Sequence, residues 1–283
     1  MWALQHYILN FHKNYVYLTT FWWYIIISMK AKERINSIID RIPYNGFIMI
    51  KDLSTQFNVT EETIRRDLNK IVAMNIGVRK AHGGAYRIHQ GDLAAPQKFR
   101  QMMIPAIKQR FASFCATLIT SESCIMLDSS TSSRFIAEKI KELNKRITII
   151  TNSIATAGIF EDCEHISVVC VGGNLRKLNG SLVGPNAIAT LEKYCADCCF
   201  VSPPSVDIKF GLTDHNEEEA RIRECMLRQS KKCYLVADHT KFGWSSINHI
   251  AGIDTIDMII TDSEIDQKWL HWLKTIGKEY TCC

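Results

Sequence analysis

The spacing of hydrophobic residues in the first third of the chain predicts three short helices and a hairpin. Apolar side chains recur every three or four residues in each helical stretch, and a proline follows the first one. Two apolar runs then flank a histidine and two glycines, which is typical of two strands joined by a tight turn. In chain order, the expected elements are helix Lys30–Arg41, strand Phe47–Ile50, helices Lys51–Phe57 and Thr63–Met74, and strands Gly77–Lys80 and Ala85–Ile88.

The third helix has one apolar face and one basic face. Thr60 is a good N-cap, and two glutamates follow it in the first turn, where acidic side chains suit the helix dipole. The residues expected to be buried are Ile64, Leu68 and Ile71. Arg65 and Arg66 must then point away from the core. Because arginine can bind guanine bidentately and phosphate through charged hydrogen bonds, this layout is typical of a DNA recognition helix.

From residue 107 onward, short apolar runs alternate with helical stretches. The expected strands are Cys124–Asp128, Ile147–Thr151, Ile166–Val171, Asp197–Val201, Cys233–Ala237 and Asp257–Thr261. The expected helices are Ile107–Ile119, Phe135–Leu143, Ala155–Phe160, Asn186–Tyr194 and Glu217–Gln229. This alternation predicts an α/β fold with a mostly parallel sheet covered on both faces. In such sheets, ligands bind beyond the carboxyl ends of the strands.

Polar residues follow several of these strands at the edge where a ligand would bind. The first strand ends at Asp128, and five hydroxyl residues and Arg134 come next, at the start of a helix. Free N–H groups, hydroxyls and a nearby cation at a helix N-terminus suit a phosphate, although a serine-rich turn with an N-cap has the same composition. The hydroxyl residues are Ser129, Ser130, Thr131, Ser132 and Ser133. Other strand ends supply Asn152, Gly172, Gly173, Arg176 and Lys241.

The excess positive charge is concentrated in the first third of the chain. The 283 residues carry 34 Lys and Arg against 29 Asp and Glu, a net charge of +5, and this length is enough for two domains. Residues 30–90 hold 11 basic and 6 acidic residues, whereas residues 91–283 hold 22 and 23. A basic unit joined to a neutral body predicts a polyanion-binding module on a separate core. The alternative is a solvated charged helix beside an ordinary hairpin.

The eleven cysteines do not have the pattern of a disulfide scaffold or of a complete metal site. They all lie between Cys115 and Cys283, without the regular spacing of a small secreted protein. The C-x-x-C-C cluster at 195–199 could be half of a metal site, or a helix end that runs into a buried strand. No second ligand pair completes a zinc set and no P-loop is visible, so we expect neither metal nor cofactor.

Residues 1–28 differ in composition from the remainder of the chain. They hold nine aromatic residues, one base and no acid. The apolar run Phe21–Ile27 is shorter than the roughly 20 residues that a bilayer-spanning helix needs, and no small-residue cleavage site follows it. We expect an atypical extension outside the natural product and no stable membrane association; a membrane-surface anchor is the alternative.

The run from Asp52 to Tyr86 resembles the winged helix-turn-helix of the DeoR family of bacterial transcription repressors. The most specific parts are Thr63–Leu68 (TIRRDL) and His82–Ala85 (HGGA). The body resembles the DeoR-type effector domain, which is related to ribose-5-phosphate isomerase. The motifs that carry this second resemblance are, in the family's order, LDSSTSS, ITIITNS, VVCVGGNLR, IKFGLTD, ADHTKFG and MIITD.

The resemblance implies a sequence-specific regulator that represses a carbohydrate-catabolism operon until a phosphorylated sugar relieves it. It implies double-stranded operator DNA as a partner, a homodimer or homotetramer, and a cytoplasmic, nucleoid-associated location in a bacterium. The implied DNA-binding residues are Thr60, Glu62, Thr63, Arg65, Arg66, Lys70, Arg79, Lys80 and His82. The implied effector-binding residues are Asp128, Ser129, Ser130, Thr131, Ser132, Ser133, Asn152, Gly172, Gly173, Arg176 and Lys241.

The expected domain order is an atypical extension, a DNA-binding domain, a linker and a sensor domain. Their expected ranges are 1–28, 31–86, 87–105 and 106–283. The alternative function is a sugar-phosphate isomerase or deaminase that carries a DNA-binding head. Such chemistry needs a positioned general base, and Asp128, Asp214 and Asp238 are carboxylates at expected loop positions. None of them sits in a motif that marks catalysis, so we expect no enzymatic activity.

Overall fold

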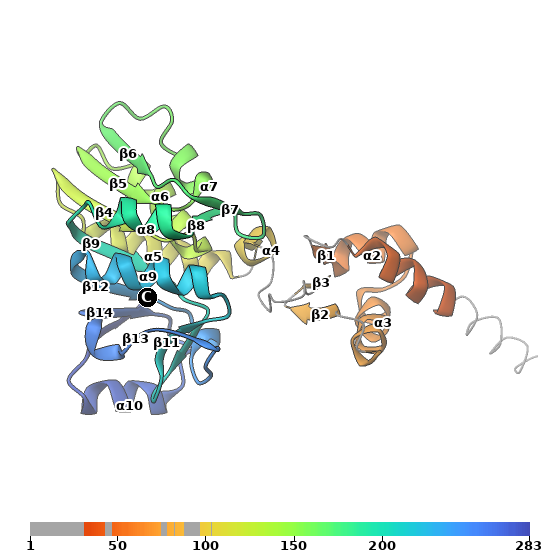
Figure 1. Cartoon of the computed structure of the whole chain (residues 1–283). Coiled ribbons are helices and arrows are strands. Elements are labelled where there is room, and N and C mark those ends of the chain that lie inside the picture. The colour runs from red at the N-terminus through yellow and green to blue at the C-terminus, as the bar shows by residue number, and fades with distance from the viewer. Residues whose placement is uncertain (1–30, 43–46, 75–77, 82, 88–96, 103) are drawn as a thin grey trace, which may run out of the picture. The chain divides into compact units, whose positions relative to one another are not determined.

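The chain divides into two compact units, one ending at His89 and the other beginning at Gln90 (Figure 1). The computed structural model describes residues 31–42, 47–74, 78–81, 83–87, 97–102 and 104–283. The expectations for residues 1–28, for His82 and for 88–96 therefore lie outside the described residues. No helix in the described part is long and apolar enough to cross a membrane.

The first unit has the predicted winged helix-turn-helix fold. A helix over 31–41 precedes α2 (Ile50–Phe57) and α3 (Glu61–Ala73). The strands β1 (Phe47–Met49), β3 (Gly84–Arg87) and β2 (Val78–Ala81) form an antiparallel sheet in that order. Side chains from all these helices and from the β2–β3 hairpin form one core: Ile35, Ile38, Ile42, Ile50, Leu53, Ile64, Leu68, Ile71, Val78 and Ala85.

The second unit is built on a seven-stranded sheet in which every neighbouring pair is parallel. The spatial order is β15-β14-β12-β9-β4-β5-β6. The strands are β4 (Ser123–Leu127), β5 (Ile147–Thr151), β6 (Ile166–Cys170), β9 (Ala196–Val201), β12 (Ser230–Val236), β14 (Met258–Thr261) and β15 (Glu279–Cys282). Their near-continuous apolar sequences follow from burial on both faces. The α/β prediction is thereby confirmed.

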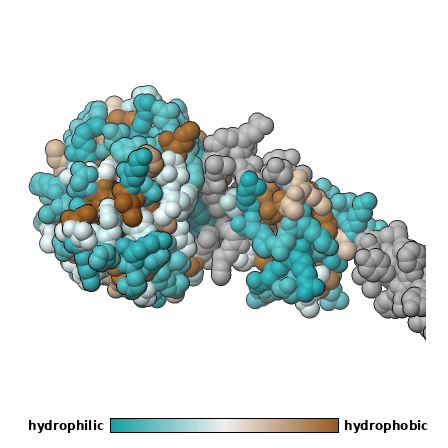
Figure 2. All heavy atoms as spheres, turned by 90° about the horizontal axis from the view of Figure 1, so that it is seen from below, coloured by the Kyte–Doolittle hydropathy of each residue, from teal (hydrophilic) through white to brown (hydrophobic). Residues whose placement is uncertain are grey.

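Successive residues of each strand enter different cores, because side chains alternate across a sheet. Ile125 and Leu127 of β4 pack with α5 (Pro105–Thr117) and α6 (Thr131–Lys141). Met126, between them, packs in the other core. That core also holds side chains of α8 (Pro185–Leu191), α9 (Glu217–Arg228) and α10 (Gln267–Thr275). Seen from below, hydrophilic residues surround small apolar patches on this unit (Figure 2).

Several short elements were not among the expected ones. They are α4 (Gln97–Met102), the β7–β8 hairpin (Asn174–Arg176, Ser181–Val183), and an antiparallel sheet of β10 (Ser205–Asp207), β11 (Gly211–Asp214) and β13 (Asn248–Ala251). The helix expected at Ala155–Phe160 is present as α7, at Ile154–Gly158. The final elements α10 and β15 were also missed. Runs of three or four residues contain too little periodicity to reveal a strand. The helix α4 lies within the range 87–105 that was expected to be a linker.

The strand order reverses between β4 and β9. From β4 the chain moves outward through β5 and β6, and then returns to β9 and continues outward through β12, β14 and β15 on the other side. A crevice forms at the carboxyl ends of the strands where the direction of winding changes, and α/β proteins bind ligands there. The loops that follow β4 and β9 begin at Asp128 and Ser202. The tertiary structure thus selects these two loops as the candidate binding edge.

Candidate functional site

The first candidate site is the exposed face of α3. The Thr60 hydroxyl caps the helix by accepting a hydrogen bond of 3.3 Å from the main-chain N of Thr63. The predicted stripe is fully buried, with Ile64, Leu68 and Ile71 all at 0% exposure. A cap and a buried stripe fix how the helix is rotated, so its other face must meet solvent. The order of cap, acidic turn and apolar stripe in the sequence was sufficient to predict this.

Arg65 and Arg66 lie on the solvent-exposed face of α3. Their side chains are 50% and 75% exposed. Arg65 Nη2 lies 3.2 Å from a carboxylate oxygen of Glu61, and Arg66 Nε lies 3.3 Å from one of Glu62. Exposed pairs of this spacing contribute only about 0.3–0.5 kcal/mol. The two arginines can therefore exchange these glutamates for another anion at little cost.

The β2–β3 hairpin adds further basic side chains to the first unit. Lys80 Nζ donates a hydrogen bond of 2.6 Å to Oδ1 of Asn69, which links the hairpin to α3. Arg79 is exposed, and its guanidinium donates to the carbonyl of Val78 at 3.3 Å. Lys70 is also exposed on α3. The Lys80–Asn69 contact places the hairpin next to α3, as the wing of the predicted fold.

The second candidate site surrounds Asp128, at the carboxyl end of β4. Oδ1 of Asp128 accepts hydrogen bonds from the main-chain N of Ser130 (3.1 Å) and from the Ser133 hydroxyl (2.5 Å). Oδ2 accepts from the main-chain N of Ser202 (3.0 Å) and from Arg223 Nε (2.7 Å). Burial alone would raise the pKa of this carboxyl, but Arg223 and these hydrogen bonds lower it to about 2. Both oxygens are thus occupied by the protein, and Asp128 holds the two loops together.

All five hydroxyl residues after Asp128 are buried, and they surround the start of α6. Ser130 is the N-cap, and its hydroxyl accepts from the main-chain N of Ser133 at 3.0 Å. This corrects the expectation that the helix begins at Phe135, because Thr131, Ser132 and Ser133 form its first turn. The Ser132 hydroxyl lies 3.1 Å from that of Ser202. Hydroxyls and helix N–H groups together make a surface suited to an oxyanion.

Three cations, Lys241, Lys108 and Arg100, interact electrostatically with one another in this region. Lys241 Nζ is 2.6 Å from the Ser202 hydroxyl. Lys108, on α5, is 4% exposed and donates to the carbonyl of Arg100. Burial lowers the pKa of all three side chains, and the charge of Lys241 helps to lower the pKa of Lys108 to about 7. A bound anion would stabilise the charged form of each of them.

Sequence reasoning missed Lys108 and Arg100. Lys108 occupies the same helical face as Ala112 and Cys115, both of which are buried. A lysine at an apolar position of an amphipathic helix was therefore a usable signal. Arg100 had no such signal, because its neighbours come from remote parts of the chain. Its Nη2 donates to Oδ1 of Asn179 at 2.7 Å.

Glu219 of α9 forms a second buried centre beside the loop. It accepts hydrogen bonds from the hydroxyls of Ser129 (3.0 Å) and Ser181 (2.5 Å) and from the Asn179 amide (2.9 Å). Arg176 Nη1 lies 3.4 Å from the same carboxylate. Burial opposes ionisation of Glu219, but Arg223 and these donors lower its pKa overall. Two residues predicted to bind the effector, Ser129 and Arg176, thus contact Glu219.

The remaining predicted residues differ in their surroundings. Gly173 has φ +117°, and a Cβ there would lie 2.5 Å from the carbonyl oxygen of Val183, so packing requires glycine. Gly172 has open space around it. Asn152 is buried and donates to the carbonyl of Leu182 at 3.2 Å, while its Oδ1 has no hydrogen-bond partner among the described residues.

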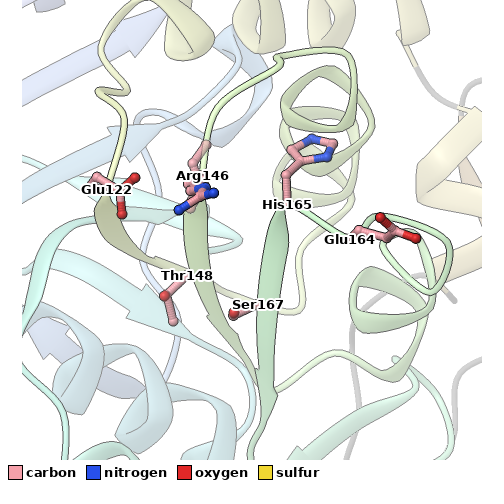
Figure 3. Close-up of a pocket in the computed structure, with 7 residues that line it drawn as sticks. Glu122, Arg146, Thr148, Glu164, His165 and Ser167 are labelled. Carbon is pink, nitrogen blue, oxygen red and sulfur yellow. The ribbon is translucent and has the colours of Figure 1, made fainter.

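A pocket of about 430 Å³ lies at the opposite end of the same sheet (Figure 3). It is lined by residues before or at the start of β4, β5 and β6: Glu122, Arg146, Ile147, Thr148, Glu164, His165 and Ser167. In parallel strands the amino ends lie away from the carboxyl ends, so this pocket is separate from the Asp128 loop. It contains none of the predicted effector residues.

Comparisons with known proteins cover both units of the chain. A DeoR-like helix-turn-helix domain matches residues 34–91, and a DeoR C terminal sensor domain matches residues 105–263. The chain is 33% identical over 238 residues to the uncharacterized HTH-type transcriptional regulator YulB of Bacillus subtilis (84% of this chain, 91% of the relative). It is 31% identical over 254 residues to a putative aga operon transcriptional repressor of Escherichia coli O157:H7 (88% and 93%).

More distant similarities extend this set. The glycerol-3-phosphate regulon repressor of Escherichia coli K12 is 26% identical over 235 residues (83% of this chain, 92% of the relative). Ribose 5-phosphate isomerase A of Methanocaldococcus jannaschii matches 49% of this chain and 55% of its own, with TM-score 0.37 and 12% identity. The chain thus spans about half of that enzyme. The two family models and the relatives show that this chain belongs to the DeoR family of DNA-binding transcriptional regulators.

Proposed function

We propose that the protein represses a carbohydrate-catabolism operon and is released from its operator by a phosphorylated sugar. The observation that carries the proposal is the combination, in one chain, of two sites. One is the capped helix α3 with the exposed Arg65 and Arg66. The other is a buried hydroxyl loop at a helix N-terminus, beside the cations Lys108 and Lys241.

The DNA-binding part of the proposal assigns a role to each basic side chain. Arg65 and Arg66 contact base edges and phosphates in the major groove, while Arg79 and Lys80 contact the backbone. A pseudo-palindromic operator requires a second copy of the chain, so a homodimer or homotetramer is the proposed active form. Double-stranded DNA as target implies a cytoplasmic protein. Relatives named as repressors of the aga operon and of the glycerol-3-phosphate regulon support a sugar-related operon.

The effector part of the proposal assigns the phosphate to the loop between Asp128 and α6. The N–H groups and hydroxyls at the start of α6 bind the phosphate oxygens, and Lys241 and Lys108 neutralise the charge. The sugar then extends toward Asn152 and Gly172. An effector that weakens DNA binding must itself bind the DNA-bound form less tightly, because the coupling between two sites is reciprocal.

The alternative, a sugar-phosphate isomerase or deaminase, lacks support from the site. Asp128 and Asp214 both pair with the buried Arg223, so these carboxylates are already engaged by the protein. General-base catalysis needs a carboxylate that can reach the substrate. Incubation with ribose 5-phosphate or glucosamine 6-phosphate, followed by NMR, should show no turnover.

The first experiment measures DNA binding by fluorescence anisotropy. The DNA comes from immediately upstream of the gene and from neighbouring operons, at two salt concentrations, with and without a panel of sugar phosphates. We expect tight, sequence-dependent binding that one compound releases. Binding that is uniform across sequences and steeply lost in salt would show only a basic surface, and would contradict the proposal.

A further inference from the structure

Helix α4 lies near the β7–β8 hairpin (Figure 1) and makes hydrogen bonds to the hairpin and to the hydroxyl loop. Gln97 Nε2 donates a hydrogen bond of 3.0 Å to the carbonyl of Ser129, the first residue of the loop. The main-chain N of Gln97 donates to the carbonyl of Leu178 at 3.3 Å, within the hairpin turn. One turn later, Arg100 binds the side chain of Asn179 at 2.7 Å. Both ends of this short helix are thus held by segments that surround the proposed effector site.

A third contact to α4 comes from Lys108 on α5. Lys108 Nζ donates to the carbonyl of Arg100. Burial and the charge of Lys241, which lies 2.6 Å from the Ser202 hydroxyl, lower the pKa of this lysine. An oxyanion bound beside Lys241 attracts the ammonium of Lys108 more strongly than a neutral carbonyl does. Anion binding therefore competes with one of the hydrogen bonds that fix α4.

The position of α4 in the chain gives this competition a consequence. Among the described residues, α4 is the first element after β3, which belongs to the DNA-binding unit. If α4 changes position, the chain segment between α4 and the DNA-binding unit must change with it. No other described helix combines contact with the hydroxyl loop and this place in the chain.

We propose that α4 is a latch that reports occupancy of the anion site, with Gln97 and Arg100 as positioning residues that do not contact the effector. The latch is held when the site is empty, and an anion at the start of α6 releases it by withdrawing Lys108. The inference rests on the proposed function, because it assigns the hydroxyl loop to a phosphate. It adds the path by which that phosphate acts.

Hydrogen–deuterium exchange of the full chain, with and without inorganic phosphate, tests the latch. In the unsubstituted protein we expect phosphate to slow exchange in the first turn of α6 and to accelerate it in α4. Gln97→Ala removes the donor to Ser129, so exchange in α4 should already be fast without phosphate, and phosphate should add no further increase. Gln97→Glu, which keeps the size but not the donor, should behave in the same way.

Two controls separate the latch from loss of the site. Gln101→Ala lies on the same helix, carries no side-chain hydrogen bond among the described residues, and should keep the full response. Phosphate affinity, measured by calorimetry, should not fall in Gln97→Ala and should rise by the coupling factor, because a contact that phosphate releases opposes phosphate binding. A full α4 response in Gln97→Ala, or a response at α6 without one at α4 in the unsubstituted protein, would overturn the latch. No response at α6 would instead refute the anion site, and the latch with it.

Discussion

Arg223 Nε on α9 donates a hydrogen bond of 2.7 Å to Oδ2 of Asp128 at the end of β4, although 95 residues separate them. The same guanidinium pairs with Asp214 and lies 3.8 Å from Glu219. The three carboxylates raise the pKa of Arg223 in spite of its burial. This buried network fixes the loops at the carboxyl edge of the sheet, and its loss should be measurable as stability.

Asp128→Asn should destabilise the sensor unit. The substitution removes the charge that pairs with Arg223. It also places an amide N–H₂ group where the carboxylate of Asp128 accepts hydrogen bonds from N–H and O–H donors. Breaking a buried ion pair costs about 3 kcal/mol or more, and urea unfolding of the full chain measures it. As a control, Glu217→Gln breaks the exposed Glu217–Arg221 ion pair on α9, the helix that carries Arg223, and should cost less than about 1 kcal/mol. Equal effects of the two substitutions would contradict a structural role for Asp128.

The Asp128 carboxyl should also make the free energy of unfolding decrease in acid. Its pKa is about 2 in the folded protein against 3.8 ordinarily, so its contribution is complete above about pH 4. That contribution, roughly 2 kcal/mol, is lost as the pH falls from about 4 toward 2. Unfolding free energies measured across this range should fall more steeply for the unsubstituted protein than for Asp128→Asn. Parallel profiles would exclude Asp128 as the source.

Phosphate affinity should fall as the pH rises above about 7. The pKa of Lys108 is lowered to about 7 in the empty site, and binding an anion requires the charged form. Above that pH, binding must take up a proton, which reduces the affinity by up to about tenfold per pH unit. Calorimetry in buffers of different ionisation enthalpy detects the proton directly. Lys108→Arg stays charged, so its phosphate affinity should fall less steeply above pH 7 than that of the unsubstituted protein; an equally steep fall would assign the proton to another group.

Alanine substitutions at Gly172 and Gly173 should have different effects, because only Gly173 is closely packed. Gly173→Ala should destabilise the protein by about 2–4 kcal/mol, because its φ is +117° and its Cβ would meet the Val183 carbonyl. Gly172→Ala meets nothing within 4 Å and should leave the melting temperature unchanged. If Gly172→Ala binds the sugar phosphate more weakly, the added methyl group must contact the ligand, because it contacts no protein atom. A large loss of stability in Gly172→Ala would contradict this division.

Arg65→Ala and Arg66→Ala should each weaken operator binding by about 1–3 kcal/mol, which is roughly 5- to 150-fold. Loss of a phosphate contact also lowers the salt slope by about one, whereas loss of a base contact relaxes specificity at one position. Arg221→Ala is the control, because Arg221 has the same i,i+4 pairing with a glutamate on α9 of the sensor unit. Anisotropy titrations of the three variants give the comparison; unchanged binding by both α3 variants would remove α3 as the recognition helix.

Glu62→Gln should strengthen binding to random-sequence DNA. Glu62 holds Arg66 at 3.3 Å and repels phosphate, so its neutralisation removes both a competitor and a repulsion. We expect an increase of roughly twofold or more at low salt, which anisotropy resolves. A loss of affinity confined to operator DNA would show instead that the Glu62 carboxylate accepts a hydrogen bond from a base.

Local patterns in the sequence determined the secondary elements that are long enough to show a period. The stripe of Ile64, Leu68 and Ile71 and the cap at Thr60 identified α3 and its exposed arginines. The apolar runs identified the main parallel strands, and their order along the chain identified the α/β class. These signals are local because helix and strand periods arise from the backbone itself. The hydroxyl run from Ser129 to Ser133 was found by its composition and by its place after an apolar strand.

Only the tertiary structure decided which of these pieces meet. The strand order places the loops after β4 and β9 side by side, and the pairing of β12 with β9 brings Lys241 to Ser202. The packing of α9 brings Arg223 to Asp128. The tertiary structure also places Arg100 of α4 against Asn179 and sets Gly173 against Val183. Such contacts depend on which strands pair and which helices cover them, and hydrophobic periodicity contains no information about pairing partners far along the chain.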